Sequence, residues 1–168
     1  MKVLNDASWG FGFPVLRFNF RGTGLSEGVH DGEAETGDVL AALEWLDREF
    51  HLPLVAVGFS FGAAMTIAAL SSARGRNLPV RALVALGLPL EASGRIYSYP
   101  GLASLTLPKL FLSGDSDPFA PADQLARVTA LAANTQQLAL IAGADHFFTG
   151  RIEPMQQALA GWLLEHLP

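Results

Sequence analysis

The sequence predicts an α/β protein with a doubly wound, mostly parallel sheet of about five strands and helices on both faces. Two observations support this prediction: short apolar segments alternate with amphipathic ones along the whole chain, and several apolar segments end at glycine turns. The chain has 168 residues, half of them hydrophobic, which is enough for one core. We find no linker or internal repeat, so we expect one domain over residues 1–168.

The expected strands are short and apolar, and they cover residues 14–20, 52–57, 80–86, 109–112 and 137–141. The second of them is continuously apolar, as expected of a strand buried on both faces. Apolar side chains recur at helical spacing over residues 39–50, 63–70, 121–131 and 155–163, where we expect helices. Residues 88–106 contain prolines and glycines and predict an irregular excursion between two strands.

Composition excludes several classes of protein. The net charge of −5 and the scattered basic residues argue against a nucleic-acid surface. No apolar run is long enough to span a bilayer, and the N-terminus lacks the apolar stretch of a signal peptide. The absence of cysteine excludes disulfides and thiolate metal sites. We therefore expect a cytoplasmic protein without nucleic-acid or membrane partners.

Three side chains of complementary reactivity follow three of the expected strands. Ser60 comes after the strand at 52–57, Asp117 after that at 109–112, and His146 after that at 137–141. Ligands of parallel sheets bind at the carboxyl ends of the strands, so we expect these side chains to lie close together.

Serine, histidine and aspartate in this arrangement predict nucleophilic catalysis. The hydroxyl of Ser60 becomes an effective nucleophile when a neutral His146 takes its proton, while Asp117 would fix the imidazole tautomer. Ser60 also lies in the segment GFSFG at 58–62, between an apolar strand and a buried helix. A sharp strand-to-helix turn of this kind needs small neighbours, and the helix N-terminus that follows favours developing negative charge.

Five segments carry a resemblance to a known family: RFNFRG at 17–22, the glycine-rich turn that runs on to residue 28, GFSFGA at 58–63, SGDSD at 113–117 and DHFF at 145–148. From about residue 13 to the C-terminus, the chain resembles the α/β-hydrolase superfamily. It is most similar to small lid-less bacterial serine hydrolases of the esterase-like or dienelactone-hydrolase-like kind. The resemblance implies Ser60 as nucleophile, Asp117 as acid, His146 as base, and the backbone N–H of Phe61 as one oxyanion donor.

Two alternatives concern side chains near these residues. Asp115 is a rival for the acid, but the family pattern favours Asp117 and leaves Asp115 to hold its loop by hydrogen bonds. Tyr97 and Tyr99, in the irregular excursion, either line an acyl pocket or cover the sheet, and the sequence does not separate these two roles.

Other polar features predict no further site. His30, His51 and His166 are expected to be solvated surface residues, and because no pair has metal-site spacing we expect no metal. The segment RGTG at 21–24 lacks the lysine and the spacing of a phosphate-binding loop, so we interpret it as a tight turn. No cofactor is expected.

The resemblance fails before residue 14. Members of the superfamily usually carry about three strands and a helix there, whereas the 13 residues present would supply at most part of that helix. The missing piece includes the strand between those at 14–20 and 52–57, and the loop that gives the second oxyanion N–H.

Three explanations stay open. The chain is a fragment or a mis-started reading frame; or it is a minimal hydrolase whose two flanking strands pair directly; or an exposed strand edge pairs with a second copy in a homodimer. We favour oligomerisation if the chain is complete.

These observations predict a serine hydrolase that cleaves small-molecule carboxylic esters through an acyl-enzyme on Ser60. The excursion at 88–106 is too short for a large lid, so we expect an open site that favours short acyl chains and shows no interfacial activation. The alternative is a catalytically impaired pseudoenzyme, fragment or binding scaffold without a complete oxyanion hole.

Overall fold

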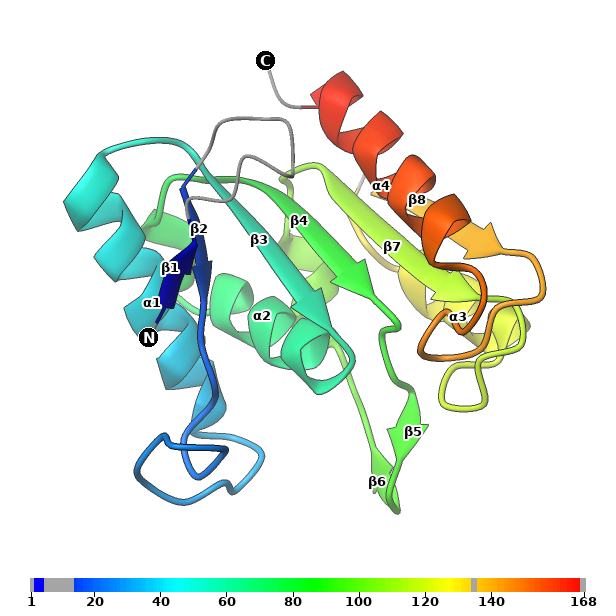
Figure 1. Cartoon of the computed structure of the whole chain (residues 1–168), viewed down its shortest axis with the longest axis horizontal. Helices are drawn as coiled ribbons and strands as arrows, with labels where there is room; N and C mark the ends of the chain where they lie inside the picture. Colours follow the sequence, from blue (N-terminus) through cyan, green and yellow to red (C-terminus); the bar gives the residue numbers. More distant parts are fainter. Residues whose placement is uncertain (1, 5–13, 134–135, 167–168) are drawn as a thin grey trace.

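The computed structural model describes residues 2–4, 14–133 and 136–166, and its main sheet has four parallel strands in the order β3-β4-β7-β8 (Figure 1). The strands are β3 (Leu54–Phe59), β4 (Val80–Leu86), β7 (Lys109–Gly114) and β8 (Gln136–Ile141). The helices are α1 (Glu35–Phe50), α2 (Phe61–Ser71), α3 (Ala122–Thr129) and α4 (Ile152–His166). The predicted α/β class, with helices on both faces of a parallel sheet, is confirmed.

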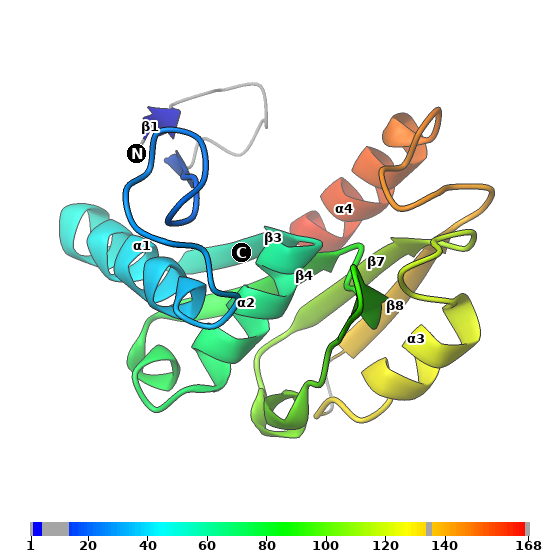
Figure 2. The ribbon, with the colours of Figure 1, turned by 90° about the horizontal axis from the view of Figure 1, so that it is seen from below.

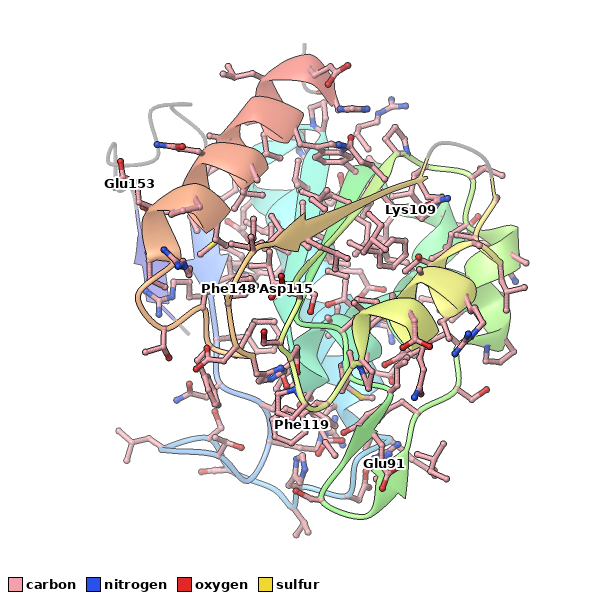
Figure 3. All side chains as sticks on the ribbon, turned by 90° about the vertical axis from the view of Figure 1, so that its right-hand side faces the viewer. Glu91, Lys109, Asp115, Phe119, Phe148 and Glu153 are labelled. Atoms are coloured by element: carbon pink, nitrogen blue, oxygen red, sulfur yellow. The ribbon has the colours of Figure 1, made fainter. Side chains whose placement is uncertain are left out.

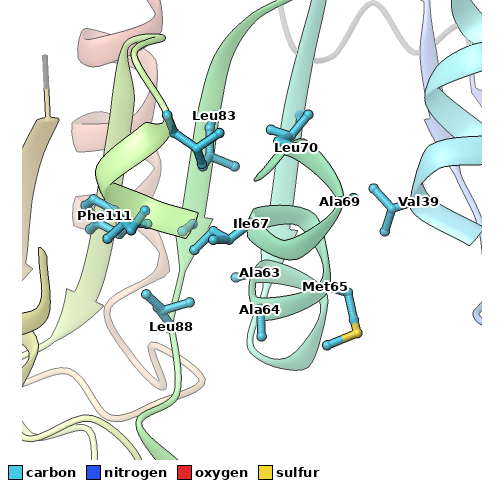
Figure 4. Packing of buried hydrophobic residues seen from close by; sticks show 14 of the residues in the cluster. Val39, Ala63, Ala64, Met65, Ile67, Ala69, Leu70, Leu83, Leu88 and Phe111 are labelled. Atoms are coloured by element: carbon cyan, nitrogen blue, oxygen red, sulfur yellow. The ribbon is translucent and has the colours of Figure 1, made fainter. Parts of the chain in front are cut away.

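The helices divide unequally between the two faces of the sheet. Helices α1, α2 and α3 cover one face and α4 covers the other (Figure 2). On the first face, Ile67 of α2 points toward Leu83 of β4 and Phe111 of β7 (Figure 4). On the second face, Trp162 and other apolar side chains of α4 pack over the opposite side of the strands. The sheet therefore separates two hydrophobic clusters.

Strand register brings the loops that follow the strands to one edge of the sheet. Strands β3 and β4 pair from Leu54 opposite Val80 to Phe59 opposite Leu86. Strands β7 and β8 pair as far as Gly114 opposite Ile141, so the two loops beyond them start at the same level. The loops that carry the expected reactive residues therefore leave the sheet side by side.

The strand expected over residues 14–20 lies outside the main sheet. Only Val15–Arg17 form a strand, β2, and it pairs in antiparallel fashion with β1 (Lys2–Leu4) in a separate two-stranded sheet. The sheet of about five strands thus has four, because β2 finds its hydrogen-bond partner in β1 and not in β3. The sequence allowed the first 13 residues at most part of a helix; residues 2–4 form strand β1, and residues 5–13 lie outside the described residues.

Strand β3 is an edge strand of the main sheet, because β2 does not pair with it. Within the described residues it pairs only with β4, and its Val57 and Phe59 side chains are 52% and 41% exposed. The homodimer through an exposed strand edge stays a prediction, and β3 is the strand at which it would form.

Residues 88–106 form the expected short excursion. It consists of a hairpin of β5 (Glu91–Ala92) and β6 (Arg95–Ile96), followed by the 3₁₀ turn η3 (Pro100–Ser104). Another 3₁₀ turn, η2 (Gly75–Asn77), precedes β4. Tyr97 and Tyr99 are partly buried against the first cluster, and the Tyr99 hydroxyl donates a hydrogen bond to the Pro89 carbonyl at 2.5 Å. Both tyrosines thus cover the core.

An ion pair ties the turn after β2 to helix α1. The guanidinium of Arg21 donates from Nη2 to Oδ1 of Asp38 at 2.7 Å, and the Arg21 backbone N–H donates to Oδ2 at 3.0 Å. The side-chain hydrogen bond from Arg21 holds the pKa of Asp38 below its usual value. The turn RGTG is therefore anchored to the start of α1.

We expect Asp38→Asn to lower the melting temperature at neutral pH by about 2–4 °C. Because the folded-state pKa is lowered, the ion pair stabilises the fold above the unfolded-state pKa of Asp38, and this stability is lost as pH falls through the folded-state pKa. Melting curves between pH 7 and 3 should show a smaller loss on acidification in the variant. Asp123→Asn is the matched control, because its pair with Arg127 is 67–71% exposed. Parallel pH profiles for Asp38→Asn and the wild type would contradict the prediction.

Candidate active site

Ser60 lies at the junction of β3 and α2 in a backbone conformation that few residues adopt. Its φ is 52° and its ψ is −122°, and its N–H donates to the Leu86 carbonyl at 2.9 Å. A Cβ on Gly58 would lie 2.6 Å from backbone atoms of Ala63 and Gly62, so only glycine fits there. At Gly62 the nearest neighbour of an added Cβ is 3.8 Å away, an ordinary contact. Of the two glycines that flank the turn, only Gly58 is therefore required by a close approach of the backbone.

The structure brings Ser60, His146 and Asp117 together in one chain of hydrogen bonds. Nδ1 of His146 lies 2.8 Å from Oδ2 of Asp117, and Nε2 of His146 lies 2.9 Å from Oγ of Ser60. Because a carboxylate only accepts, the imidazole donates through Nδ1 and its Nε2 is free to accept the serine proton. Asp117 and His146 are 3% and 4% exposed, so the hydrogen bond between these two side chains is shielded from water.

Further hydrogen bonds fix the Asp117 carboxylate. Its Oδ1 accepts the backbone N–H of Phe119 at 2.8 Å, and its Oδ2 also accepts the hydroxyl of Ser113 at 3.2 Å. Both oxygens are therefore satisfied in a buried position, as a buried charge requires. Ser113 belongs to the segment SGDSD and is buried in β7, but its contact with Asp117 was not predicted from the sequence.

Asp115 joins two loops and, within the described residues, makes no hydrogen bond to His146. Its Oδ1 accepts the N–H of Gly143 at 2.9 Å, while the N–H of Ser116 donates to the Ala144 carbonyl at 3.0 Å. The loop after β7 is thereby attached to the loop after β8. Figure 3 shows Asp115 at the opposite end of β7 from the buried Lys109. This is the role in holding the loop that the sequence suggested for Asp115.

Helix α2 begins directly after Ser60 and offers unpaired donors. Within the described residues, the N–H groups of Phe61 and Gly62 donate to no acceptor, whereas the Ala63 N–H donates to the Ser60 carbonyl at 2.9 Å. Free N–H groups at a helix start stabilise negative charge. They could therefore hold the oxygen of a carbonyl attacked at Ser60.

His30 and His51 are exposed, as the sequence predicts, whereas His166 is partly buried, and two of these histidines make contacts that the sequence did not predict. Nδ1 of His30 lies 2.7 Å from Oε1 of Glu35, a fully buried carboxylate. The ring of His166 is partly buried and stacks on Trp162, with ring centroids 4.3 Å apart. Sequence reasoning missed both contacts, because neither partner stands out by spacing or by motif.

A cavity of about 450 Å³ lies beside α2 and apart from Ser60, Asp117 and His146. Its lining includes Met65 and Ala68 of α2 together with Tyr97 and Tyr99 of the excursion. None of the three reactive residues lines it, so the two tyrosines do not form a pocket around the serine.

Neither a cluster of metal-ligating side chains nor a membrane-spanning helix occurs in the described residues. Over residues 2–4, 14–133 and 136–166, no group of three His, Asp or Glu side chains could hold a metal ion. In the same ranges, no helix has the length and apolar character needed to cross a bilayer.

Comparisons with known proteins match this architecture. A family model described as an alpha/beta hydrolase domain matches residues 1–158. An uncharacterized protein of Rickettsia prowazekii is 32% identical over 174 residues, covering 97% of this chain and 68% of that protein. A putative esterase of Escherichia coli is 47% identical over 66 residues, covering 38% of this chain and 18% of that protein.

Among solved structures, an α/β serine hydrolase without a lid from Xanthomonas campestris aligns with a TM-score of 0.80. It is 26% identical, and the alignment covers 96% of this chain and 72% of that one. The chain spans 54% of the length of two further relatives, from Mycobacterium tuberculosis.

Proposed function

Because the chain belongs to the alpha/beta hydrolase domain family, we propose that it is a serine hydrolase that cleaves carboxylic esters. The observation that carries the proposal is the chain of hydrogen bonds from Asp117 through His146 to Ser60, at 2.8 and 2.9 Å. The similarity to a putative esterase of Escherichia coli supports esters as the substrate class.

In the proposed mechanism, Oγ of Ser60 attacks the ester carbonyl while Nε2 of His146 takes its proton. Asp117 holds the imidazole in the required tautomer and stabilises the imidazolium that forms. The N–H of Phe61 donates to the oxyanion, and His146 then returns the proton to the departing alcohol. Water releases the acyl group from Ser60 by the same steps, with His146 again acting as the base.

The short excursion supports a substrate with a short acyl chain. Its hairpin strands have two residues each, and η3 has five, so this segment is too small to form a helical lid. The proposed site is open to a small-molecule ester and needs no cofactor for this chemistry.

An active-site-directed fluorophosphonate tests the proposal. We expect it to add its phosphonyl mass to the intact protein, with the modified peptide containing Ser60, because only an activated serine reacts. Ser60→Ala should abolish the modification, while Ser98→Ala, which removes an exposed serine of the excursion, should not. Absence of modification in the wild type would overturn the proposal.

A non-catalytic binding scaffold is the second candidate. It is favoured by the oxyanion side of the site, where we identify no donor beyond the start of α2 among the described residues. Loss of one oxyanion donor typically lowers the rate by about 10²–10³-fold. A scaffold should give no burst of nitrophenol when mixed with a nitrophenyl ester, whereas a working acyl-enzyme should.

A further inference from the structure

Three phenylalanine rings surround the imidazole of His146. The ring centroids of Phe119, Phe59 and Phe147 lie 4.7, 5.1 and 5.1 Å from that of His146. Phe119 and Phe147 approach edge to face, at interplanar angles of 73° and 85°, and Phe59 is tilted by 39°. Figure 3 shows Phe119 beyond the end of β7 that carries Asp115. The three rings come from three different strand ends, and together they form an aromatic group around the base.

Two of these rings are exposed although they adjoin a buried imidazole. Phe147 is 65% exposed and Phe59 is 41% exposed, while His146 is 4% exposed. Their centroids lie 6.0 Å apart, so the two exposed rings form one surface. Adjacent exposed aromatic side chains beside a reactive group are typical of a binding surface.

Backbone hydrogen bonds to the Asp145 side chain fix the loop after β8 that carries Phe147. Oδ1 of Asp145 accepts the N–H groups of Phe147 and Thr149 at 3.0 and 2.9 Å. The next residue, Phe148, is 2% exposed and anchors the loop in the cluster under α4. Phe147 is thus presented to solvent by a fixed backbone, which limits the entropy that a ligand would cost by ordering it.

The position of these rings identifies the part of the substrate that they meet. In acylation the Oγ–C bond forms and the C–O bond to the leaving group breaks. The proton from Oγ passes to Nε2 of His146 and then to the departing oxygen, giving the free alcohol. The departing oxygen must therefore reach Nε2 of His146, whose ring centroid lies 5.1 Å from those of Phe59 and Phe147.

We propose that Phe59 and Phe147 bind the alcohol portion of the ester and that this portion carries a flat aromatic ring. This inference rests on the proposed ester hydrolysis at Ser60 and adds the class of leaving group. Offset or edge-to-face contacts between aromatic rings favour a flat aromatic ring over a saturated ring of the same size.

Benzyl acetate and cyclohexylmethyl acetate test the proposal, because their alcohols match in length and nearly in basicity. The rates are divided by the hydroxide-catalysed rates of the same esters, which removes the remaining difference in reactivity. We expect kcat/KM to favour the benzyl ester by about 2- to 10-fold. The released alcohols are measured by chromatography.

Variants of Phe147 test whether its ring causes the preference for the benzyl ester. Phe147→Leu keeps an apolar side chain without the ring and should reduce the ratio toward one, whereas Phe147→Tyr should retain it. The control is Leu164→Ala, which removes a side chain that is 69% exposed near the far end of α4, and it should leave both rates unchanged.

The outcomes separate this inference from the proposed function. A ratio of one in the wild type, with Ser60 still modified by the fluorophosphonate, would overturn the aromatic leaving group alone. A ratio that survives in both Phe147→Leu and Phe59→Leu would overturn the role of these two rings. Absence of both turnover and modification would overturn the inference together with ester hydrolysis.

Discussion

Replacing Ser60 with alanine is expected to lower kcat for nitrophenyl acetate by about 10⁴-fold or more. Alanine removes Oγ, which is the only atom of this residue that can form the acyl-enzyme, while the backbone turn at φ 52° is retained. Because Ser60 is only partly buried and its hydroxyl bonds to His146 alone among the described residues, the fold should persist. Initial rates of nitrophenol release measure the effect, and circular dichroism checks the fold.

A double variant shows whether Ser60 and His146 act as one unit. His146→Gln alone should cost about as much as Ser60→Ala, and the two changes together should cost little more, because removing either member stops the same proton transfer. Additive losses would mean that the two residues contribute independently, and would contradict the proposed mechanism.

The proximity of Ser60, Asp117 and His146 could be predicted from sequence because it follows from a rule about sheets. Ser60 and His146 are 86 positions apart, yet both follow strands whose carboxyl ends meet at one edge. The family pattern favours Asp117 over Asp115, but the pattern does not give the physical reason. The structure gives that reason in the contacts of the two carboxylates. The Asp117 carboxylate lies 2.8 Å from the imidazole, whereas that of Asp115 is engaged by the Gly143 N–H.

Strand boundaries were less predictable because apolar composition and hydrogen bonding end at different residues. The apolar run over 52–57 stops at Gly58, but the ladder continues through Gly58 and Phe59, which pair with Ala85 and Leu86. The sequence also did not show that β2 pairs with β1 outside the main sheet, for a related reason. The residues of a strand indicate that it is extended and apolar, but they do not indicate which strand it pairs with.

Buried polar contacts were the features most hidden in the sequence. Glu35 is fully buried at the start of α1, where a glutamate is ordinarily solvated, because the ring of His30 and the N–H of Asp31 both bond to its Oε1. The rings around His146 were hidden in the same way. Phe59, Phe119 and Phe147 lie in three loops or strand ends, and only the assembled fold brings them to one imidazole.

Asp117→Asn is expected to lower kcat by about 10³–10⁴-fold without unfolding the protein. The amide oxygen of the asparagine can accept the Phe119 N–H as Oδ1 of Asp117 does at 2.8 Å, which directs the amide NH₂ toward His146. Nδ1 of the imidazole must then accept a hydrogen bond, so the ring proton moves to Nε2. An imidazole protonated at Nε2 cannot take the proton of Ser60, and acylation fails although the side chains keep their places.

Asp115→Asn is the matched comparison, because it makes the same chemical change two residues away. Its amide oxygen can still accept the Gly143 N–H, now 2.9 Å from Oδ1 of Asp115, so the attachment between the two loops survives. We therefore expect kcat to fall by less than about 10-fold, with KM nearly unchanged. Steady-state kinetics of the two variants on one ester decide between the carboxylates. A larger loss in Asp115→Asn than in Asp117→Asn would mean that Asp115 is the acid and that the 2.8 Å contact between Asp117 and His146 is structural.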